Sequence, residues 1–180
     1  MLSGADLGRL AFLGESGLDT RMARSHARAP RGRRAAGRIP GGHRRRLTIL
    51  GAMARDGVVA AMTVAAATGT AVFVAFVEQV LAPALKERPG AVLVMDNLAP
   101  HKAAAARRAL DRAGLERRYL PPYSPDLNPI EQAWSKVKER LRQAGARGVE
   151  ALDDAIPDAL DAITAADAAA WFRHCGYRPD

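Results

Sequence analysis

The stretch Ala91-Val-Leu-Val-Met-Asp-Asn97 decides how this sequence folds. Its first five residues are all apolar, which predicts a short strand that is buried on both faces. A second stretch, Leu120-Pro-Pro-Tyr-Ser-Pro-Asp-Leu-Asn-Pro-Ile-Glu131, ends a further strand at its two prolines and opens an amphipathic helix. Asp96 therefore ends a buried strand, and Glu131 begins a helix with 34 residues between the two acids. Two carboxylates placed in this way can share a divalent metal ion.

The segments around this centre alternate between strand and helix patterns. In chain order we predict a strand over 7–13, extended hairpin and loop structure over 14–42, strands over 47–54 and 58–65, a helix over 71–86, a strand over 91–95, a helix over 101–113, a strand over 115–120, a helix over 128–144, and one or two helices over 149–170. Asp56-Gly57 between two apolar runs is a strong hairpin signal. The order predicts one α/β domain over residues 1–180, with a mixed sheet and helices on both faces.

Charge and cysteine content narrow the function. The net charge of +8 and the pI of about 10.5 favour a polyanionic partner, most often a nucleic acid, although a solvated basic surface would give the same balance. Cys175 is the single cysteine, so no internal disulfide can form, as in a reducing cytosol. The longest apolar run, 58–77, is broken by Thr and Gly and is not a convincing membrane span. We therefore expect a cytoplasmic, nucleoid-associated protein with no membrane partner.

Asp96 and Glu131 each have a structural explanation that needs no catalysis. Asp-Asn is a common turn pair, so Asp96 could simply end its strand. Asn128 would suit a helix N-cap, which places Glu131 at the third helical position of a capping box. The surroundings of Glu131 favour a further role, because Ser135, Lys138 and Arg142 follow it on one helical face at spacings of four, three and four. This basic ridge is suited to phosphates.

A second basic region lies near the amino terminus. Ten arginines, interrupted by Pro and Gly, occupy it: Arg21, Arg24, Arg28, Arg31, Arg33, Arg34, Arg38, Arg44, Arg45 and Arg46. They could form a solvated loop, but such dense like charges repel one another unless a polyanion screens them. We predict that Arg31, Arg33, Arg34, Arg44, Arg45 and Arg46, together with Lys138 and Arg142, contact the phosphate backbone of DNA, with strong salt dependence and little sequence preference.

The same motifs resemble a known family. Val94-Met-Asp-Asn-Leu-Ala-Pro-His-Lys102 and Tyr119-Leu-Pro-Pro-Tyr-Ser-Pro-Asp-Leu-Asn-Pro-Ile-Glu-Gln-Ala-Trp134 are similar to sequences in transposases of the insertion-sequence 630 and mariner superfamily. Phe12-Leu-Gly-Glu-Ser-Gly-Leu18, the Arg-rich segment from Ala29 and Phe73-Val-Ala-Phe-Val-Glu78 extend the resemblance over nearly the whole chain. The string from Ser124 to Glu131 is highly specific to this family, so chance is a poor explanation for the resemblance.

The resemblance implies an RNase H-like fold and a DDE catalytic triad. It implies the catalytic domain of a transposase, which cuts double-stranded DNA at the ends of a mobile element and joins them to a target. It also implies two Mg²⁺ or Mn²⁺ ions, and a homodimer that pairs two DNA ends. Carried over by motif, Asp96 is the second catalytic, metal-binding acid and Glu131 the third. Asn97 and His101 belong to the motif without a firm chemical role, and His101 is best explained as a helix-start residue that packs near the acids.

Two departures from the family pattern affect this interpretation. Gly14 stands where the family has its first Asp, and glycine supplies no metal ligand. Glu15 is next to it, but adjacent strand residues point to opposite faces, so Glu15 cannot replace the missing acid unless the strand bulges. The sequence also begins close to the first predicted strand, so we expect the family's helix-turn-helix module to be lacking. We therefore expect an impaired enzyme, and the alternatives are a non-catalytic DNA-binding remnant or a generic Mg²⁺ nuclease.

Overall fold

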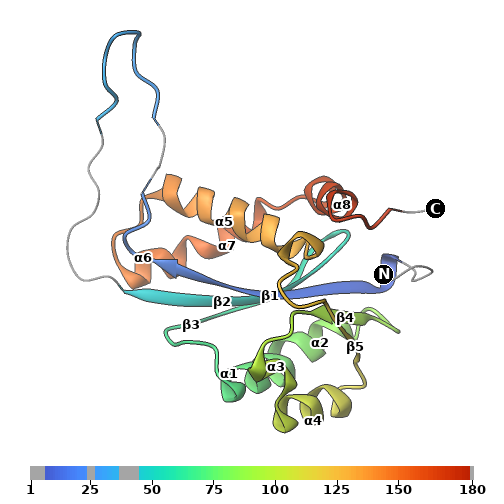
Figure 1. Cartoon of the computed structure of the whole chain (residues 1–180). Coiled ribbons are helices and arrows are strands. Elements are labelled where there is room, and N and C mark those ends of the chain that lie inside the picture. The colour runs from blue at the N-terminus through green and yellow to red at the C-terminus, as the bar shows by residue number, and fades with distance from the viewer. Residues whose placement is uncertain (1–6, 24–26, 37–44, 179–180) are drawn as a thin grey trace.

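A five-stranded sheet forms the centre of the computed structural model, which describes residues 7–23, 27–36 and 45–178 (Figure 1). The strands are β1 (Leu10–Asp19), β2 (Arg46–Ala54), β3 (Gly57–Val64), β4 (Val92–Met95) and β5 (Glu116–Tyr119), in the spatial order β3-β2-β1-β4-β5. The first three strands are antiparallel neighbours, whereas β4 and β5 run parallel to β1. This topology confirms the predicted mixed sheet.

Helices cover both faces of the sheet, as predicted (Figure 1). One face carries α5 (Ile130–Ala144), α6 (Val149–Asp154), α7 (Ile156–Asp161) and α8 (Ala165–His174). The other carries α1 (Thr70–Phe76), a π-helical turn over Val77–Leu81, α2 (Ala82–Leu85), α3 (Ala99–Lys102) and α4 (Ala104–Arg112). Short 3-10 turns at Leu7–Arg9 and Pro125–Leu127 precede β1 and α5. Each helical layer encloses its own hydrophobic core.

Strand β1 separates the two cores. Leu10 and Phe12 point into the α5 core, whereas Ala11 and Leu13 point into the α1–α4 core. Strand β4 alternates in the same way, with Val94 on the α5 side. The alternation follows from the two-residue period of a strand, and it fixes which side each later residue of β1 and β4 can reach.

Some predicted boundaries were wrong. β1 runs on through Gly14 to Asp19, in the segment expected to be loop, because antiparallel pairing with β2 from Glu15↔Leu50 to Asp19↔Arg46 overrides a weak strand sequence. The predicted helix over 101–113 is two helices, since Ala103 adopts an extended ψ of 146° between α3 and α4. The predicted helix over 71–86 is continuous but contains the π-helical turn.

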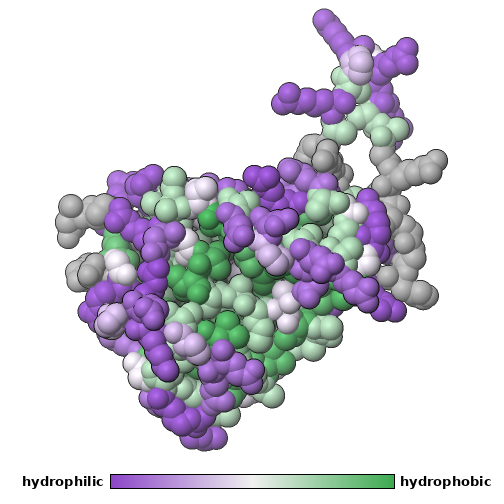
Figure 2. Space-filling view, turned by 180° about the vertical axis from the view of Figure 1, so that it is seen from behind, coloured by the Kyte–Doolittle hydropathy of each residue, from purple (hydrophilic) through white to green (hydrophobic). Residues whose placement is uncertain are grey.

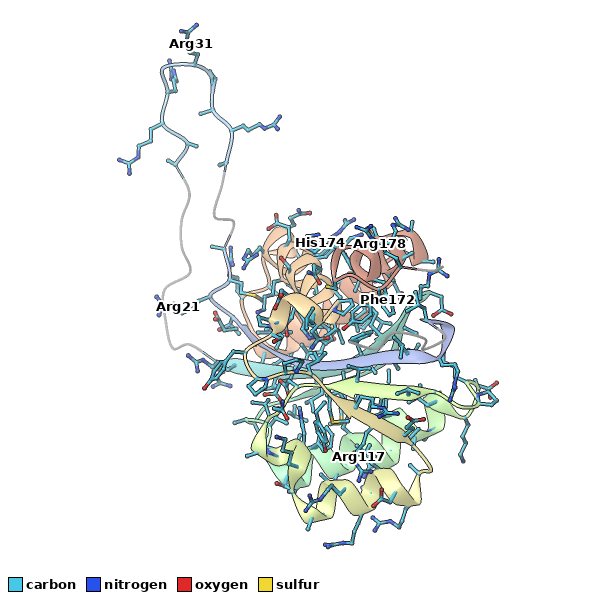
Figure 3. All side chains as sticks on the ribbon, turned by 45° about the vertical axis from the view of Figure 1, so that its right-hand side comes forward. Arg21, Arg31, Arg117, Phe172, His174 and Arg178 are labelled. Atoms are coloured by element: carbon cyan, nitrogen blue, oxygen red, sulfur yellow. The ribbon has the colours of Figure 1, made fainter. Side chains whose placement is uncertain are left out.

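The Arg-rich region connects β1 to β2, and its central described stretch, residues 27–36, is exposed throughout. Figure 3 shows Arg31 at the far end of this part and Arg21 near the sheet. In the space-filling view the same part stands clear of the body and carries purple, hydrophilic residues among pale green ones (Figure 2). Arg24, Arg38 and Arg44 lie outside the described residues. Within the described ranges, no helix combines the length and the apolarity that crossing a membrane requires.

Candidate active site

A pocket of about 460 Å³ opens where the carboxyl end of β4 meets the start of α5. Asp96 and Glu131 both line it, together with Lys102, Asn128 and the segment 120–125. β1 and β4 are parallel, so the Arg-rich connection leaves the sheet at the same end as Asp96. The fold thus brings the two predicted acids into one pocket.

Asp96 directly follows β4 and is held from the α3 side. Its Oδ1 lies 2.8 Å from Nδ1 of His101, without the alignment of a hydrogen bond, and 3.3 Å from the backbone N–H of Leu98, which donates to it. The His101 ring is completely buried and packs on Phe73 with ring centroids 4.4 Å apart. His101 therefore packs against Asp96, as predicted, and restricts the positions that this carboxylate can adopt.

Glu131 does not take part in a capping box, so that structural explanation for it was wrong. Helix α5 begins at Ile130 after Pro129, with no side-chain cap. Asn128 is buried instead, and its Nδ2 donates to the Leu13 carbonyl of β1 at 3.4 Å. The Glu131 side chain is left free to face the pocket.

Burial and charge act on Glu131 in opposite directions. Loss of water around the carboxylate is the largest effect and raises its pKa, Lys138 lowers it, and the nearby charge of Asp96 raises it again. The net result is a pKa above the ordinary value of 4.5. Glu131 therefore interacts electrostatically with both the second acid of the pocket and the basic ridge of its own helix.

Gly14 and Asp96 lie at the same end of the sheet. The parallel pairing of β1 with β4 ends at Phe12↔Val94, and each of the two residues follows two positions later in its own segment. A Cβ built on Gly14 would point toward α5, 2.5 Å from Cγ2 of Ile130 and 3.2 Å from Nε1 of Trp134. A side chain at residue 14 would therefore point toward the start of α5, where Ile130 fills the space.

Trp134 packs across two paired glycines, Gly14 and Gly51. The sequence did not predict this contact. Gly14 pairs with Gly51 of β2, and a Cβ at Gly51 would lie 2.7 Å from Cη2 of Trp134. Nε1 of Trp134 is buried without a hydrogen-bond partner, as is Oδ1 of Asn128. The sequence signal was the apolar stripe that includes Trp134, but only the strand register shows that two glycines meet beneath it.

Glu15 lies on the other face of the sheet from Gly14, as the alternation of β1 requires. Its Oε2 is buried and has no hydrogen-bond partner. The strand continues through this point in regular pairing with β2 and does not bulge. Glu15 therefore does not replace the missing acid.

The predicted basic residues fall into separate groups. Lys138 is close enough to Glu131 to influence its charge, whereas Nη1 of Arg142 lies 3.5 Å from Oε2 of Glu139 and lines a second groove, between α5 and α8. Arg46 begins β2, and Arg45 precedes it at the root of the Arg-rich connection. Arg31, Arg33 and Arg34 are exposed on the projecting part. The structure leaves these arginines accessible but does not gather them at the pocket.

The sequence matches a known protein family. A family model described as DDE superfamily endonuclease matches residues 9–153. No curated protein matches the sequence. Over the described ranges, no group of three or more His, Cys, Asp or Glu side chains is arranged to hold a metal ion.

Solved structures share the fold. A Mos1 transposase paired-end complex with the left transposon end is 18% identical, with a TM-score of 0.77, and the match covers 94% of this chain and 52% of that one. A Mos1 mariner paired-end complex with Mn is 17% identical (TM-score 0.73; 96% and 54% covered). The Mos1 transposase catalytic domain with Raltegravir and Mg is 14% identical (TM-score 0.68; 96% and 80% covered).

This chain spans about half the length of the Mos1 chains in the paired-end complexes. The likeness confirms the RNase H-like fold that was expected from the sequence motifs. The family model covers most of the chain, including β1, Asp96 and Glu131. The chain belongs to the DDE superfamily endonuclease family.

Proposed function

We propose that this chain is the catalytic domain of a mariner-type DDE transposase whose DNA cleavage is impaired by Gly14. The observation that carries the proposal is the pocket in which Asp96 and Glu131 meet, at the end of an RNase H-like sheet. Both acids lie in the sequence strings that resemble the family and within the matched range, and Gly14 stands on β1 where the resemblance implies the first Asp.

The two acids fit a divalent metal ion. Burial raises the pKa of Glu131 most, and the charge of Asp96 adds to that rise, so the two carboxylates repel each other when both are charged. A cation between them would remove that repulsion, and Mg²⁺ or Mn²⁺ suits carboxylate and phosphate oxygens. Two of the Mos1 structures that share the fold are described as containing Mn and Mg. Gly14 offers no ligand, so we expect weak binding in place of a complete two-metal site.

In the proposed mechanism each residue of the pocket has a separate task. Bound divalent metal supplies Lewis-acid activation of water and stabilisation of the leaving oxygen in phosphodiester cleavage. Asp96 and Glu131 would hold that metal, and His101 restricts the position of Asp96 from the buried side. Lys138 lies near Glu131 and would attract the phosphate. An acid at residue 14 would supply a further metal ligand, and its absence would slow cleavage.

We further propose that the arginines bind the backbone of double-stranded DNA. Arg31, Arg33 and Arg34 are exposed on the projecting part, and Arg45 and Arg46 lie where it joins the sheet. Arg44 completes the predicted set from outside the described residues. Arg142 pairs with Glu139 at 3.5 Å, so the neighbouring negative charge partly offsets its attraction for DNA. Such contacts give affinity without sequence preference.

Pairing of two element ends by a homodimer is also a proposal for this chain. Its support is the fold shared with Mos1 transposase in paired-end complexes. A DNA-bound dimer would present two pockets, one for each end. Sedimentation of the natural chain with and without a short DNA duplex tests this, and a single DNA-bound monomer at all concentrations would contradict it.

A second candidate function is a DNA-binding protein that no longer cuts. The specific observation in its favour is Ile130, whose Cγ2 occupies the space of a side chain at residue 14. If the fold has closed around glycine, a restored acid would be displaced and would not restore chemistry. The two candidates therefore differ in how the chain responds to an acid at residue 14.

Cleavage of supercoiled plasmid in Mg²⁺ or Mn²⁺ separates them. The variants are the natural chain, Gly14→Asp, Gly14→Asp with Ile130→Ala, and Gly14→Asp with Asp96→Asn or Glu131→Gln. We expect little cutting by the natural chain, cutting by Gly14→Asp, more with Ile130→Ala because the acid gains room, and none once either pocket acid is lost. Silence of all variants that still bind DNA would favour the DNA-binding remnant.

A further inference from the structure

Two exposed apolar side chains lie on the wall of the acidic pocket. Among the described residues, Leu98 and Tyr123 are the large hydrophobic side chains that are exposed, at 39% and 102%. Both line the pocket that contains Asp96 and Glu131. They come from different segments, since Leu98 follows β4 and Tyr123 follows β5. Exposed apolar surface that collects at a single functional pocket indicates a ligand with an apolar face.

The backbone at Tyr123 is strained. Its φ of 56° is the only positive φ of a non-glycine residue in the described ranges. A bulky residue rarely adopts this left-handed conformation, which glycine or asparagine would tolerate more easily. Strain of this kind persists where the surrounding structure imposes it, and it collects at functional sites. Here it holds an aromatic ring in solvent beside the two acids.

The remaining pocket residues indicate what the ring contacts. In the proposed function the carboxylates hold a cation and, through it, a phosphate, and Lys102 adds a positive charge on the pocket wall. Leu98 and Tyr123 offer an aliphatic surface and a flat ring on the same wall. A nucleotide combines these two parts, because it joins a phosphate to a flat base over a distance that fits this pocket.

We infer that Tyr123, supported by Leu98, stacks on an unpaired nucleobase of the DNA strand whose phosphate lies at Asp96 and Glu131. The inference rests on the proposed function. In an intact duplex both faces of each base are covered by neighbouring bases, so a side chain can stack only on a base that is single-stranded or turned out of the helix. Tyr123 is thus a DNA-binding residue that favours opened DNA at the cleavage position.

The test compares two DNA molecules with the same paired sequence, one blunt and one ending in a short unpaired fork. Binding is measured by fluorescence anisotropy with Ca²⁺ in place of Mg²⁺, so that the DNA stays uncut. The variants are Tyr123→Ala, Tyr123→Gly, which also relieves the backbone strain, and Tyr123→Phe, which keeps the ring. Tyr123→Phe is the matched control.

We expect the natural chain and Tyr123→Phe to prefer the fork. Tyr123→Ala and Tyr123→Gly should bind the fork about 5- to 100-fold more weakly, with unchanged affinity for the blunt duplex, because stacking on an aromatic side chain contributes that much for each base. In a parallel measurement, 5-iodouracil at the unpaired position should photocrosslink to a peptide that contains Tyr123.

Several outcomes would overturn the inference. Fork binding by Tyr123→Ala at the natural affinity, or an equal loss for fork and blunt duplex, would contradict stacking while leaving the proposed function intact. A change of oligomeric state in Tyr123→Ala without a change in fork binding would assign the ring to a protein contact. Binding of neither DNA by the natural chain would remove the inference and the proposed function together.

Discussion

Ile130 of α5 occupies the space that a side chain at Gly14 of β1 would need, since its Cγ2 lies 2.5 Å from the position of a Cβ there. The distance is too short for any real contact, so one of the two groups must move when residue 14 changes. Ile130 is branched at Cβ and has little rotamer freedom in a helix. The glycine at residue 14 and the packing of Ile130 in the α5 core therefore depend on each other, since this packing leaves no room for an acid at residue 14.

Gly14→Ala should destabilise the chain by about 1–3 kcal/mol, because it overpacks the core against Ile130 and Trp134. Gly17→Ala is the matched control, since it lies on the same strand and a Cβ there meets nothing within 4 Å. The measurement is chemical denaturation. The natural chain, Gly14→Ala, Ile130→Ala and the variant with both changes form a double-mutant cycle. Additive effects in that cycle would show that the two positions do not compete for space.

Glu131 should make stability depend on pH in the direction of a raised pKa. A carboxyl group whose pKa is raised by folding stabilises the protein while it is protonated, and that contribution is lost as the pH rises through the folded pKa. In metal-free buffer Glu131→Gln should therefore be more stable than the natural chain at pH 7. The difference should shrink toward zero as the pH falls below the ordinary value of 4.5. A Glu131→Gln variant that is less stable than the natural chain at pH 7, with that deficit disappearing in acid, would show that the shift has the opposite sign.

Metal binding should depend on Asp96 and Glu131, and on His101, which packs against Asp96. Mn²⁺ should raise the Tm of the natural chain at pH 7, since a ligand that binds the folded state stabilises it. Asp96→Asn and Glu131→Gln should abolish the shift, and His101→Leu should weaken Mn²⁺ binding by about 10-fold, because it frees Asp96. Asp161→Asn, an exposed acid on α7, is the control. An equal Mn²⁺ shift in all variants would place the metal elsewhere.

The projecting arginines should determine the salt dependence of DNA binding. Replacing Arg31, Arg33 and Arg34 together with alanine should reduce the slope of log affinity against log salt concentration by about 2–3, because each phosphate that an arginine neutralises adds about 0.9 to that slope. The matched control removes the same charge from α4, by replacing Arg107, Arg108 and Arg112. If both triple variants reduce the slope equally, the effect comes from net charge and not from the projecting part.

Local sequence signals predicted most of the fold. The apolar run before Asp96, the Asp56-Gly57 turn and the amphipathic period of α5 each depend on neighbouring residues, and the structure confirms all three elements. The full length of β1 could not be predicted in this way. Its second half has a weak strand sequence and is ordered by pairing with β2, a contact between segments far apart in the chain.

For the site, the sequence by itself determined which acids are present and which one is absent, because the motifs around Gly14, Asp96 and Glu131 are strings of adjacent residues. Only the tertiary structure decided where their side chains point. Parallel pairing of β1 with β4 puts Gly14 and Asp96 at the same end of the sheet, and helix packing puts Ile130 over Gly14 and leaves Glu131 free of a capping role. It also decided that Tyr123 and Leu98 share the pocket, since contacts between separate segments arise only when the core packs.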